Sequence, residues 1–216
     1  MKKFAFLLIV CLLLTACGEQ NDGTSGTLSI KVIDSDQTAY KDAQVSIYSS
    51  IPEGELIFNG LTDVKGICEV GRVLQGQYGY YVVSEKDKKN YSAEQYFQVI
   101  AGDKKVLEVN PFLNSGDVKI KIVNTSSAPI VGVSVALIPH PNYSNYTYYF
   151  QDLVDESYAI VKTNSEGWVE FKDMPSNKSY SALVYYNSEN YSYSGGNNHF
   201  YIDRQTVRSY TLTVNL

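Results

Sequence analysis

The chain has 216 residues and a net charge of −5, and hydrophobic residues make up 44% of it, so it is neither disordered nor embedded in a membrane throughout. Its length fits one or two domains. Two histidines are too few for a multi-histidine metal site, and the acidic balance argues against a nucleic-acid partner, whose phosphates bind basic surfaces.

The N-terminal segment has the organisation of an export signal. Lys2 and Lys3 form a basic start, and the apolar stretch Phe4–Leu14 has the length of a secretory signal, well below the ~20 residues of a membrane-spanning helix. The four residues that end at Cys17 read LTAC and resemble the lipobox of bacterial lipoprotein precursors. The resemblance implies a signal peptide over residues 1–16, cleavage before Cys17 and a lipid on its sulfur. The alternative is an ordinary signal peptide with a chance cysteine.

A short polar segment follows the lipid site. Residues 17–26 comprise Cys17 and a Gly-rich stretch that is typical of a flexible tether. Each buried CH₂ of an acyl chain contributes about 0.8 kcal/mol, so two or three chains hold a soluble domain on a bilayer. We therefore expect a lipid-anchored protein of the bacterial cell envelope, on the outer membrane, facing either the periplasm or the cell surface. Cys68 is then the remaining thiol of the mature chain, so no internal disulfide is expected.

The rest of the chain carries one strand pattern twice. Gly26–Val32 matches Gly116–Ile122 ninety residues later, and Thr62–Gly66 matches Thr163–Gly167 at a larger offset, so the second copy holds an eleven-residue insertion between these points. Apolar and polar residues alternate in both copies, which indicates half-buried strands. The glycine that ends each Thr-x-x-x-Gly turn is expected to have a positive φ. In the first copy we expect strands near residues 27–33, 43–49, 56–62, 67–70, 78–84, 94–100 and 105–110.

Four segments of the first copy form a motif set: Gly26-x-Leu28-x-Ile30-x-Val32, Lys41-Asp42-Ala43-x-Val45, Thr62-Asp63-x-x-Gly66 and Leu74-x-Gly76-x-Tyr78. This set resembles the carboxypeptidase regulatory-like, or transthyretin-like, β-sandwich superfamily, to which the Cna-B repeats are related. The second copy departs from it, with Asn164 in place of Asp63 and Asn177 in place of Gly76. The resemblance implies an all-β fold of two tandem seven-stranded antiparallel β-sandwiches of the prealbumin type. It specifies the fold better than the activity.

Two reactions known in relatives of this fold lack their residues here. Some Cna-B relatives form an isopeptide bond between Lys and Asn or Asp with help from Glu, and the resemblance makes Glu85 and Asn110 candidates. Strand alternation turns Lys31 toward solvent, however. Alignment with the pattern of the family that the chain resembles places Val32 and Ile122 where the reactive lysines would stand. Transthyretin-like hydrolysis of 5-hydroxyisourate uses several histidines and a characteristic C-terminal tetrapeptide, a pattern that this sequence does not have. We therefore expect no catalytic residues and a protein that is not an enzyme.

The remaining candidates for chemistry favour structural roles. Cys68 shares a strand face with Val70, which predicts a buried apolar thiol in preference to a redox site. The acidic runs at residues 34–36 and 152–156 offer too few oxygen ligands for calcium, which prefers six or more. We expect neither a metal nor a cofactor.

The tyrosines carry the functional signal. Four of the 19 tyrosines lie in the inserted connection of the second copy: Tyr143, Tyr146, Tyr148 and Tyr149. Three more lie between residues 186 and 193, again among Ser and Asn. This composition is typical of recognition surfaces, because Tyr gives a large contact area with few rotamers to freeze, and flat rings stack on sugars. Trp168 is expected to face outward, as a binding platform or as part of an interface between the copies. The alternative is that Tyr suits strands and reflects an AT-rich genome.

The sequence thus predicts a non-catalytic, membrane-anchored envelope lipoprotein with sandwich domains at residues 27–113 and 114–216. It would present a binding or adhesion surface to a glycan or protein, with the four inserted tyrosines and Trp168 as ligand-binding residues. The alternative is a structural spacer, or an accessory subunit of an outer-membrane uptake or secretion complex. No nucleic-acid partner is expected.

Overall fold

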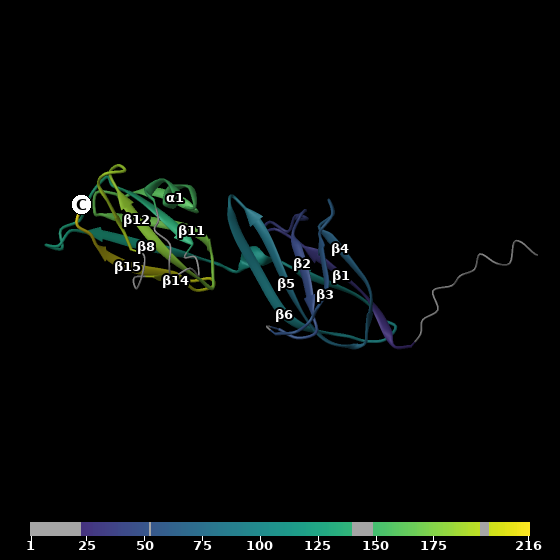
Figure 1. The fold of residues 1–216 in the computed structure, drawn as a ribbon. Coiled ribbons are helices and arrows are strands. Elements are labelled where there is room, and N and C mark those ends of the chain that lie inside the picture. Colours follow the sequence, from purple (N-terminus) through teal and green to yellow (C-terminus); the bar gives the residue numbers. More distant parts are fainter. Residues whose placement is uncertain (1–22, 52, 140–148, 195–198) are drawn as a thin grey trace, which may run out of the picture.

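The computed structural model describes residues 23–51, 53–139, 149–194 and 199–216. These residues form four β-sheets, arranged as two pairs along an elongated chain (Figure 1). The first sandwich comprises strands β1 to β7, and the second sandwich comprises strands β8 to β15. Each pair of sheets encloses its own cluster of buried apolar side chains. The all-β fold expected from the sequence is therefore confirmed.

Seven strands build the first sandwich. They are β1 (Ser25–Val32), β2 (Gln44–Tyr48), β3 (Leu56–Leu61), β4 (Ile67–Leu74), β5 (Gly76–Lys86), β6 (Lys89–Val99) and β7 (Lys104–Val109). One sheet has the order β4-β1-β7, and the other has the order β3-β2-β5-β6. Every strand expected in the first copy is present. The largest differences are that β4 continues to Leu74 and that β6 begins at Lys89.

Alternation of side chains explains how β1 is positioned. Leu28, Ile30 and Val32 are buried against the opposing sheet. Lys31 turns outward between them and forms an ion pair with Glu108 of β7, with 2.9 Å between Nζ and Oε2. Burying the apolar face stabilises the fold by about 25 cal/mol per Å² removed from water, whereas an unpaired lysine on that face would be costly to desolvate. A shift of one residue would exchange the two faces, so this pattern fixes the register.

The second sandwich repeats this plan with additions. Its elements are β8 (Ser115–Val123), β9 (Ser134–Pro139), helix α1 (Phe150–Asp155), β10 (Ala159–Lys162), β11 (Trp168–Pro175), β12 (Lys178–Tyr185), β13 (Tyr191–Tyr193), β14 (Phe200–Ile202) and β15 (Val207–Thr213). The three-stranded sheet has the order β11-β8-β15, and the five-stranded sheet has the order β10-β9-β12-β13, with β14 also paired to β12. A single turn of 3₁₀ helix, η1 (Pro111–Leu113), joins the two sandwiches.

The described part of the second sandwich has eight strands, whereas seven were expected. The extra strand arises because β13 and β14 pair with opposite ends of β12. Seven residue steps separate Tyr193 from Phe200, but three steps separate their partners Leu183 and Tyr180 on β12. The two pairings therefore differ in register, so β13 and β14 are separate strands.

Each sandwich also contains one parallel pairing, whereas wholly antiparallel sheets were expected. Strand β7 runs parallel to β1, and β15 runs parallel to β8. The chain crosses from β6 in one sheet to β7 in the other at the end of the sandwich where β1 begins. Because β7 starts at that end, it must run in the same direction as β1. The same crossing precedes β15 in the second sandwich.

The two predicted glycine turns are confirmed. Gly66 has a φ of 72° and Gly167 a φ of 78°. A Cβ on Gly66 would lie 2.5 Å from the carbonyl oxygen of Val32, so both the angle and the space exclude a side chain. Asp63 Oδ1 accepts the backbone N–H groups two and four residues later, and Asn164 Oδ1 does the same in the second turn. The Asn at this position of the second copy therefore preserves the turn.

Specific contacts join the two sandwiches end to end (Figure 1). The hydroxyl of Tyr91 on β6 donates to the carbonyl oxygen of Asp173 on β11 at 2.7 Å. Lys178 Nζ on β12 donates to the carbonyl oxygen of Asn90 at 2.7 Å. The ring of Phe112 in η1 packs on that of Tyr91, with 5.0 Å between the ring centroids. Burial raises the pKa of Tyr91, so its hydroxyl stays protonated and remains a donor.

Candidate binding surface

A short helix covers the outer face of one sheet of the second sandwich. Helix α1 (Phe150–Asp155) turns Leu153 toward the sheet. This side chain packs against Ala136 and Ile138 of β9 and Leu183 of β12, and all of them are buried. The alternate residues of both strands belong to the main core on the other face. Helix α1 therefore covers this face of the sheet, and β9 is buried on both faces.

Aromatic rings surround this helix. The ring of Phe150 lies 5.1 Å from that of Tyr185 in an edge-on arrangement and 5.4 Å from that of Tyr191. Tyr185 and Tyr191 are cross-strand partners in β12 and β13, and Tyr193 packs on the small core under the helix. Tyr149 directly precedes the helix. These five residues are called the helix-side cluster below.

The helix-side cluster presents exposed ring faces, and contacts between rings hold Phe150, Tyr185 and Tyr191 in place. Tyr149 is 72% exposed and Tyr191 is 41% exposed, whereas Phe150 and Tyr185 are half-buried beneath them. Aromatic pairs of this kind contribute about 0.5–1.5 kcal/mol beyond the area that they bury. Burial raises the pKa of Tyr193, so this hydroxyl is neutral at physiological pH. Because the ring of Tyr191 is held against Phe150, a ligand that stacks on Tyr191 pays less ordering entropy.

The charged residues next to the helix-side cluster are acidic. Helix α1 carries Asp152 and Asp155, has Glu156 at its C-terminal cap and has no basic residue in its last turn. Gln151 Nε2 donates to Asp155 Oδ1 at 2.9 Å across one turn of the helix. Carboxylates repel anionic ligands and accept hydrogen bonds from hydroxyl groups. The surroundings of the cluster therefore disfavour an anionic ligand and suit one that offers hydrogen-bond donors such as hydroxyl groups.

The structure separates the two predicted ligand-binding residues that it describes. Tyr149 belongs to the helix-side cluster. Trp168 begins β11 on the outer face of the other sheet, where Lys121 Nζ lies 5.7 Å from the centre of its ring and where Lys119 and Glu170 line a small open pocket with it. Tyr149 and Trp168 thus lie on opposite outer faces and do not form one surface. The other predicted residues lie outside the described ones: Tyr143, Tyr146, Tyr148 and the lipid site Cys17.

Sequence reasoning missed the helix and the ring contacts of Phe150 and Tyr185. A signal for them is present in the strand Ser134–Pro139. Its outward positions, Ala136 and Ile138, are as apolar as its inward ones, and such a run is typical of a strand covered on both faces. A cover for this strand could therefore have been expected from the sequence.

The residues considered for an isopeptide bond have other partners. Lys31 is on the surface and paired with Glu108. The side chain of Asn110 donates to the carbonyl oxygen of Asp34 at 3.0 Å and accepts the backbone N–H of Phe112 at 3.1 Å, which caps η1. This geometry agrees with the argument from strand alternation.

The thiol and the acidic residues show structural surroundings. Cys68 is buried in the core of the first sandwich, as expected, and burial raises the pKa of its thiol, which disfavours thiolate chemistry. Within the described ranges, no group of three or more His, Cys, Asp or Glu side chains could hold a metal ion. Of the helices in the described part of the chain, none has the length and apolar character needed to cross a membrane.

Comparison with known proteins gives likeness in structure alone. No protein-family model and no curated protein matches this sequence. The Bacillus anthracis TIE protein aligns with 88% of this chain at 17% identity and a TM-score of 0.37, and the chain spans 34% of its length. GBS52, the minor pilin of Streptococcus agalactiae, aligns over 88% of this chain and 97% of its own, at 14% identity and a TM-score of 0.49. The 5-hydroxyisourate hydrolase of Klebsiella pneumoniae aligns over 40% of this chain and 85% of its own, at 22% identity and a TM-score of 0.30.

Proposed function

We propose that this chain is a lipid-anchored, non-catalytic protein of the bacterial cell envelope that binds a glycan through its helix-side cluster. The observation that carries the proposal is the exposed ring of Tyr191 packed on the half-buried ring of Phe150, with the exposed Tyr149 next to Phe150 in the chain. Tyrosine rings stack on the flat faces of sugars, and their hydroxyl groups both donate and accept hydrogen bonds. A protein ligand is the alternative occupant of the same surface.

The proposed organisation places this surface away from the membrane. Residues 1–16 would be removed, and Cys17 would carry the lipid at the start of a tether that ends at residue 26. Domains would follow at 27–113 and 114–216, which is consistent with a separate core in each sandwich. The helix-side cluster belongs to the second sandwich, which lies beyond the first as seen from the start of β1 (Figure 1). The first sandwich would then act as a stalk.

Glycan arrays that carry neutral and acidic sugars test the binding proposal. The mature chain is expected to bind a neutral glycan, because the residues next to the cluster are acidic. Tyr149→Ala combined with Tyr191→Ala should abolish this binding. Tyr81→Ala is the matched control, because this tyrosine is a strand residue of the first sandwich with an exposure similar to that of Tyr191. Binding that survives the double substitution, or that the control also removes, contradicts the proposal.

The lipid anchor has its own test. Intact mass of the mature protein should show a chain that begins at Cys17 with a diacylglycerol group and an acylated amine. Cys17→Ser should release the protein from the membrane fraction without changing its folded core. A wild-type chain with an unmodified Cys17 would exclude the anchor and leave the glycan test unaffected.

A structural role as a spacer or accessory subunit is the second candidate. The junction favours it, because Tyr91, Asn90 and Lys178 make hydrogen bonds that hold the sandwiches end to end. A stiff body of this kind suits a part that sets a distance from the membrane. Chemical cross-linking in intact cells distinguishes the two roles: a spacer is recovered with a fixed envelope complex even when Tyr149 and Tyr191 are replaced.

A further inference from the structure

The outer face of the four-stranded sheet in the first sandwich is a continuous surface. Val45 and Ile47 of β2 point into the core, so the residues that alternate with them face outward. The register of the sheet places the outward residues in neighbouring rows that cross β3, β2, β5 and β6 in that order. Three of these rows are Leu61, Gln44, Val83 and Ser92; then Asn59, Ser46, Tyr81 and Glu94; then Leu56, Tyr48, Gly79 and Tyr96. Directly opposed residues lie about 4.5–5.5 Å apart at Cβ, so the three rows form one surface, called the tyrosine face below.

The tyrosine face exposes large side chains and carries little charge. Leu61 is 62% exposed, Tyr81 is 37% exposed and Tyr96 is 60% exposed. Glu94 is the charged residue of the three rows. The centres of protein interfaces are enriched in tyrosine and depleted of charged residues. The tyrosine face therefore has the composition of a protein interface.

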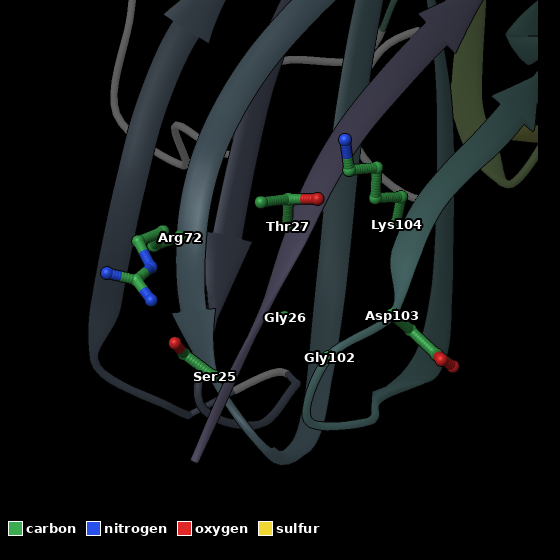
Figure 2. A pocket seen from close by; sticks show the side chains of 7 residues that line it. All are labelled: Ser25, Gly26, Thr27, Arg72, Gly102, Asp103 and Lys104. Carbon is green, nitrogen blue, oxygen red and sulfur yellow. The ribbon is translucent and has the colours of Figure 1, made fainter. Parts of the chain in front are cut away.

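The other sheet of the first sandwich has an outer face of a different kind. Arg72 and Lys104 flank Thr27 of β1 on that face (Figure 2). Lys31 and Glu108 form their ion pair on the same face. Charged side chains of both signs keep a surface hydrated and soluble. Of the two outer faces of this sandwich, the tyrosine face is thus the one suited to a protein contact.

The connection after β2 covers one corner of the tyrosine face. A Cβ added to Gly79 would lie 2.1 Å from the side chain of Ile51, so Ile51 lies directly over this glycine. The hydroxyl of Tyr96 donates to the carbonyl oxygen of Ile51 and holds the connection in place. Tyr81, in the middle row, remains exposed. The equivalent face of the second sandwich is covered by α1, so the two copies differ in what they leave open at this position.

The tyrosine face is complementary to a second copy of itself. A two-fold axis along the strands places β2 over β5 of the partner and β3 over β6 of the partner. The ring of Tyr81 then lies over the partner's Ser46, whose short side chain is 6% exposed and leaves room for a ring. Tyr96 lies over the partner's Leu56. The rings on one half of the face therefore meet small or aliphatic side chains on the other half.

The polar groups of the face also match under this symmetry. Glu94 lies over the partner's Asn59. The Oδ1 atom of Asn59 accepts hydrogen bonds from Gln44 and Ser46 at 3.4 Å each, so its Nδ2 group is the one that can donate to a carboxylate. The two Glu94 side chains lie on opposite flanks of the pair and do not repel each other at close range.

The lipid anchor proposed above sets the orientation of such a pair, and this step rests on it. The strands run between the end where β1 begins and the junction with the second sandwich, so the tyrosine face lies on the side of the chain (Figure 1). An axis along the strands brings both tethers to the same end, as two copies in one membrane require. Four strands span about 19 Å and the five residues of β2 about 17 Å, or roughly 320 Å², less than the ~800 Å² that each partner buries in a standard interface. The contact is therefore weak between free chains, and anchoring in one plane strengthens it by raising the effective concentration.

We propose that the tyrosine face joins two membrane-anchored copies of this chain in a parallel dimer. The first sandwiches pack side by side through Tyr81 and Tyr96, each against the β2 and β3 half of its partner. Both second sandwiches then point away from the membrane. The dimer presents two helix-side clusters, so a ligand with repeated units is held by two sites at once.

Cross-linking between chains that each carry one cysteine tests the dimer. Leu56→Cys and Tyr96→Cys are made separately in a chain that also has Cys17→Ser and Cys68→Ala, and both are held by an N-terminal histidine tag on vesicles with nickel-chelating lipids. A short bismaleimide should join the two variants, because positions 56 and 96 face each other across the axis. Lys104→Cys is the matched control, because this exposed residue lies on the outer face of the other sheet and should not be joined to Leu56→Cys (Figure 2). Equal yields for the two pairs would overturn the proposal, and joining of Leu56→Cys chains to one another in place of the mixed pair would exclude the parallel arrangement.

A charge in the middle row tests the tyrosine face itself. Tyr81→Glu, added to both cysteine variants, should lower the yield of the mixed pair at least tenfold, because its carboxylate would be buried over the partner's Ser46 without a cation. Tyr201→Glu, at an exposed tyrosine of the second sandwich, should leave the yield unchanged. Equal yields with the two substitutions would exclude Tyr81 from the contact and reject the dimer.

The outcomes separate this inference from the proposals above. Because the histidine tag replaces the lipid, a missing cross-link rejects the dimer and leaves the anchor standing, and an unmodified Cys17 in the wild-type chain leaves the cross-linking result unaffected. Chains that stay apart while Tyr81→Glu removes binding to a glycan array would assign the tyrosine face to a glycan and reject the dimer.

Discussion

Replacing Leu153 by Ala tests whether packing alone holds α1 on the sheet. The helix has six residues, and its N-cap residue, Tyr149, makes no side-chain cap hydrogen bond. A helix this short has no stability of its own in water. Leu153 is 1% exposed, and Leu→Ala at such a site costs about 2–5 kcal/mol. Because the main core of the second sandwich lies on the other face of β9 and β12, we expect the helix to leave the sheet while that core stays folded.

Hydrogen exchange with peptide resolution measures this local release. In Leu153→Ala, protection should fall over residues 150–155 and remain in β8 and β11. Glycan binding should fall with it, because Phe150 would no longer support Tyr191. Val154→Ala, which removes a partly buried neighbour, serves as the control and should keep most of the protection. Unchanged exchange over the helix, or a loss that extends to β8, would show that the packing argument is incorrect.

Three further predictions concern the turns and the junction. Asp63→Asn should leave stability at neutral pH nearly unchanged, because Asn164 makes the same turn. The backbone N–H of Ile67 holds the pKa of Asp63 in the folded state below its usual 3.8. The ionised Asp63 therefore contributes its full share to the free energy of unfolding above pH 3.8, and this share is lost as the pH falls through the lowered pKa. Acid unfolding of Asp63→Asn should lack this loss. Gly66→Ala should lower the free energy of unfolding by more than ~1 kcal/mol, measured with urea, since its φ is positive and its Cβ would meet a backbone oxygen. Tyr91→Phe should cost about 0.5–1.5 kcal/mol at the junction and separate the unfolding of the sandwiches in calorimetry.

Most strands of the first copy could be predicted because one face of each is exposed to solvent and the other is buried. In β1 and β8 every second residue enters the core, so a period of two in the sequence follows directly from the burial pattern. The turn glycines could be predicted for an equally local reason, since a positive φ depends on the residue itself. The outward direction of Lys31 followed from the same alternation and is observed.

Contacts between distant segments could not be predicted from local sequence patterns. The hydroxyl of Tyr91 meets the carbonyl of a residue 82 positions later, and nothing in the local sequence of β6 marks that tyrosine as different from its neighbours. The parallel course of β7 depends on which end of the sandwich the chain has reached, which is a property of the whole topology. Trp168 was correctly expected to face outward, but its distance from Tyr149 required the arrangement of the sheets.

The insertion and the outer face of the second sandwich depend on each other. In the first sandwich Ser46 pairs with Tyr81 across β2 and β5, and the tyrosine faces solvent. The equivalent pair in the second sandwich is Ala136 and Leu183, and both are fully buried. An apolar pair at this position needs a cover, and the inserted connection supplies one in α1. The helix in turn packs on this pair through Leu153. The aromatic surface therefore accompanies an apolar pair where the first sandwich has Ser46 and Tyr81, with α1 as its cover.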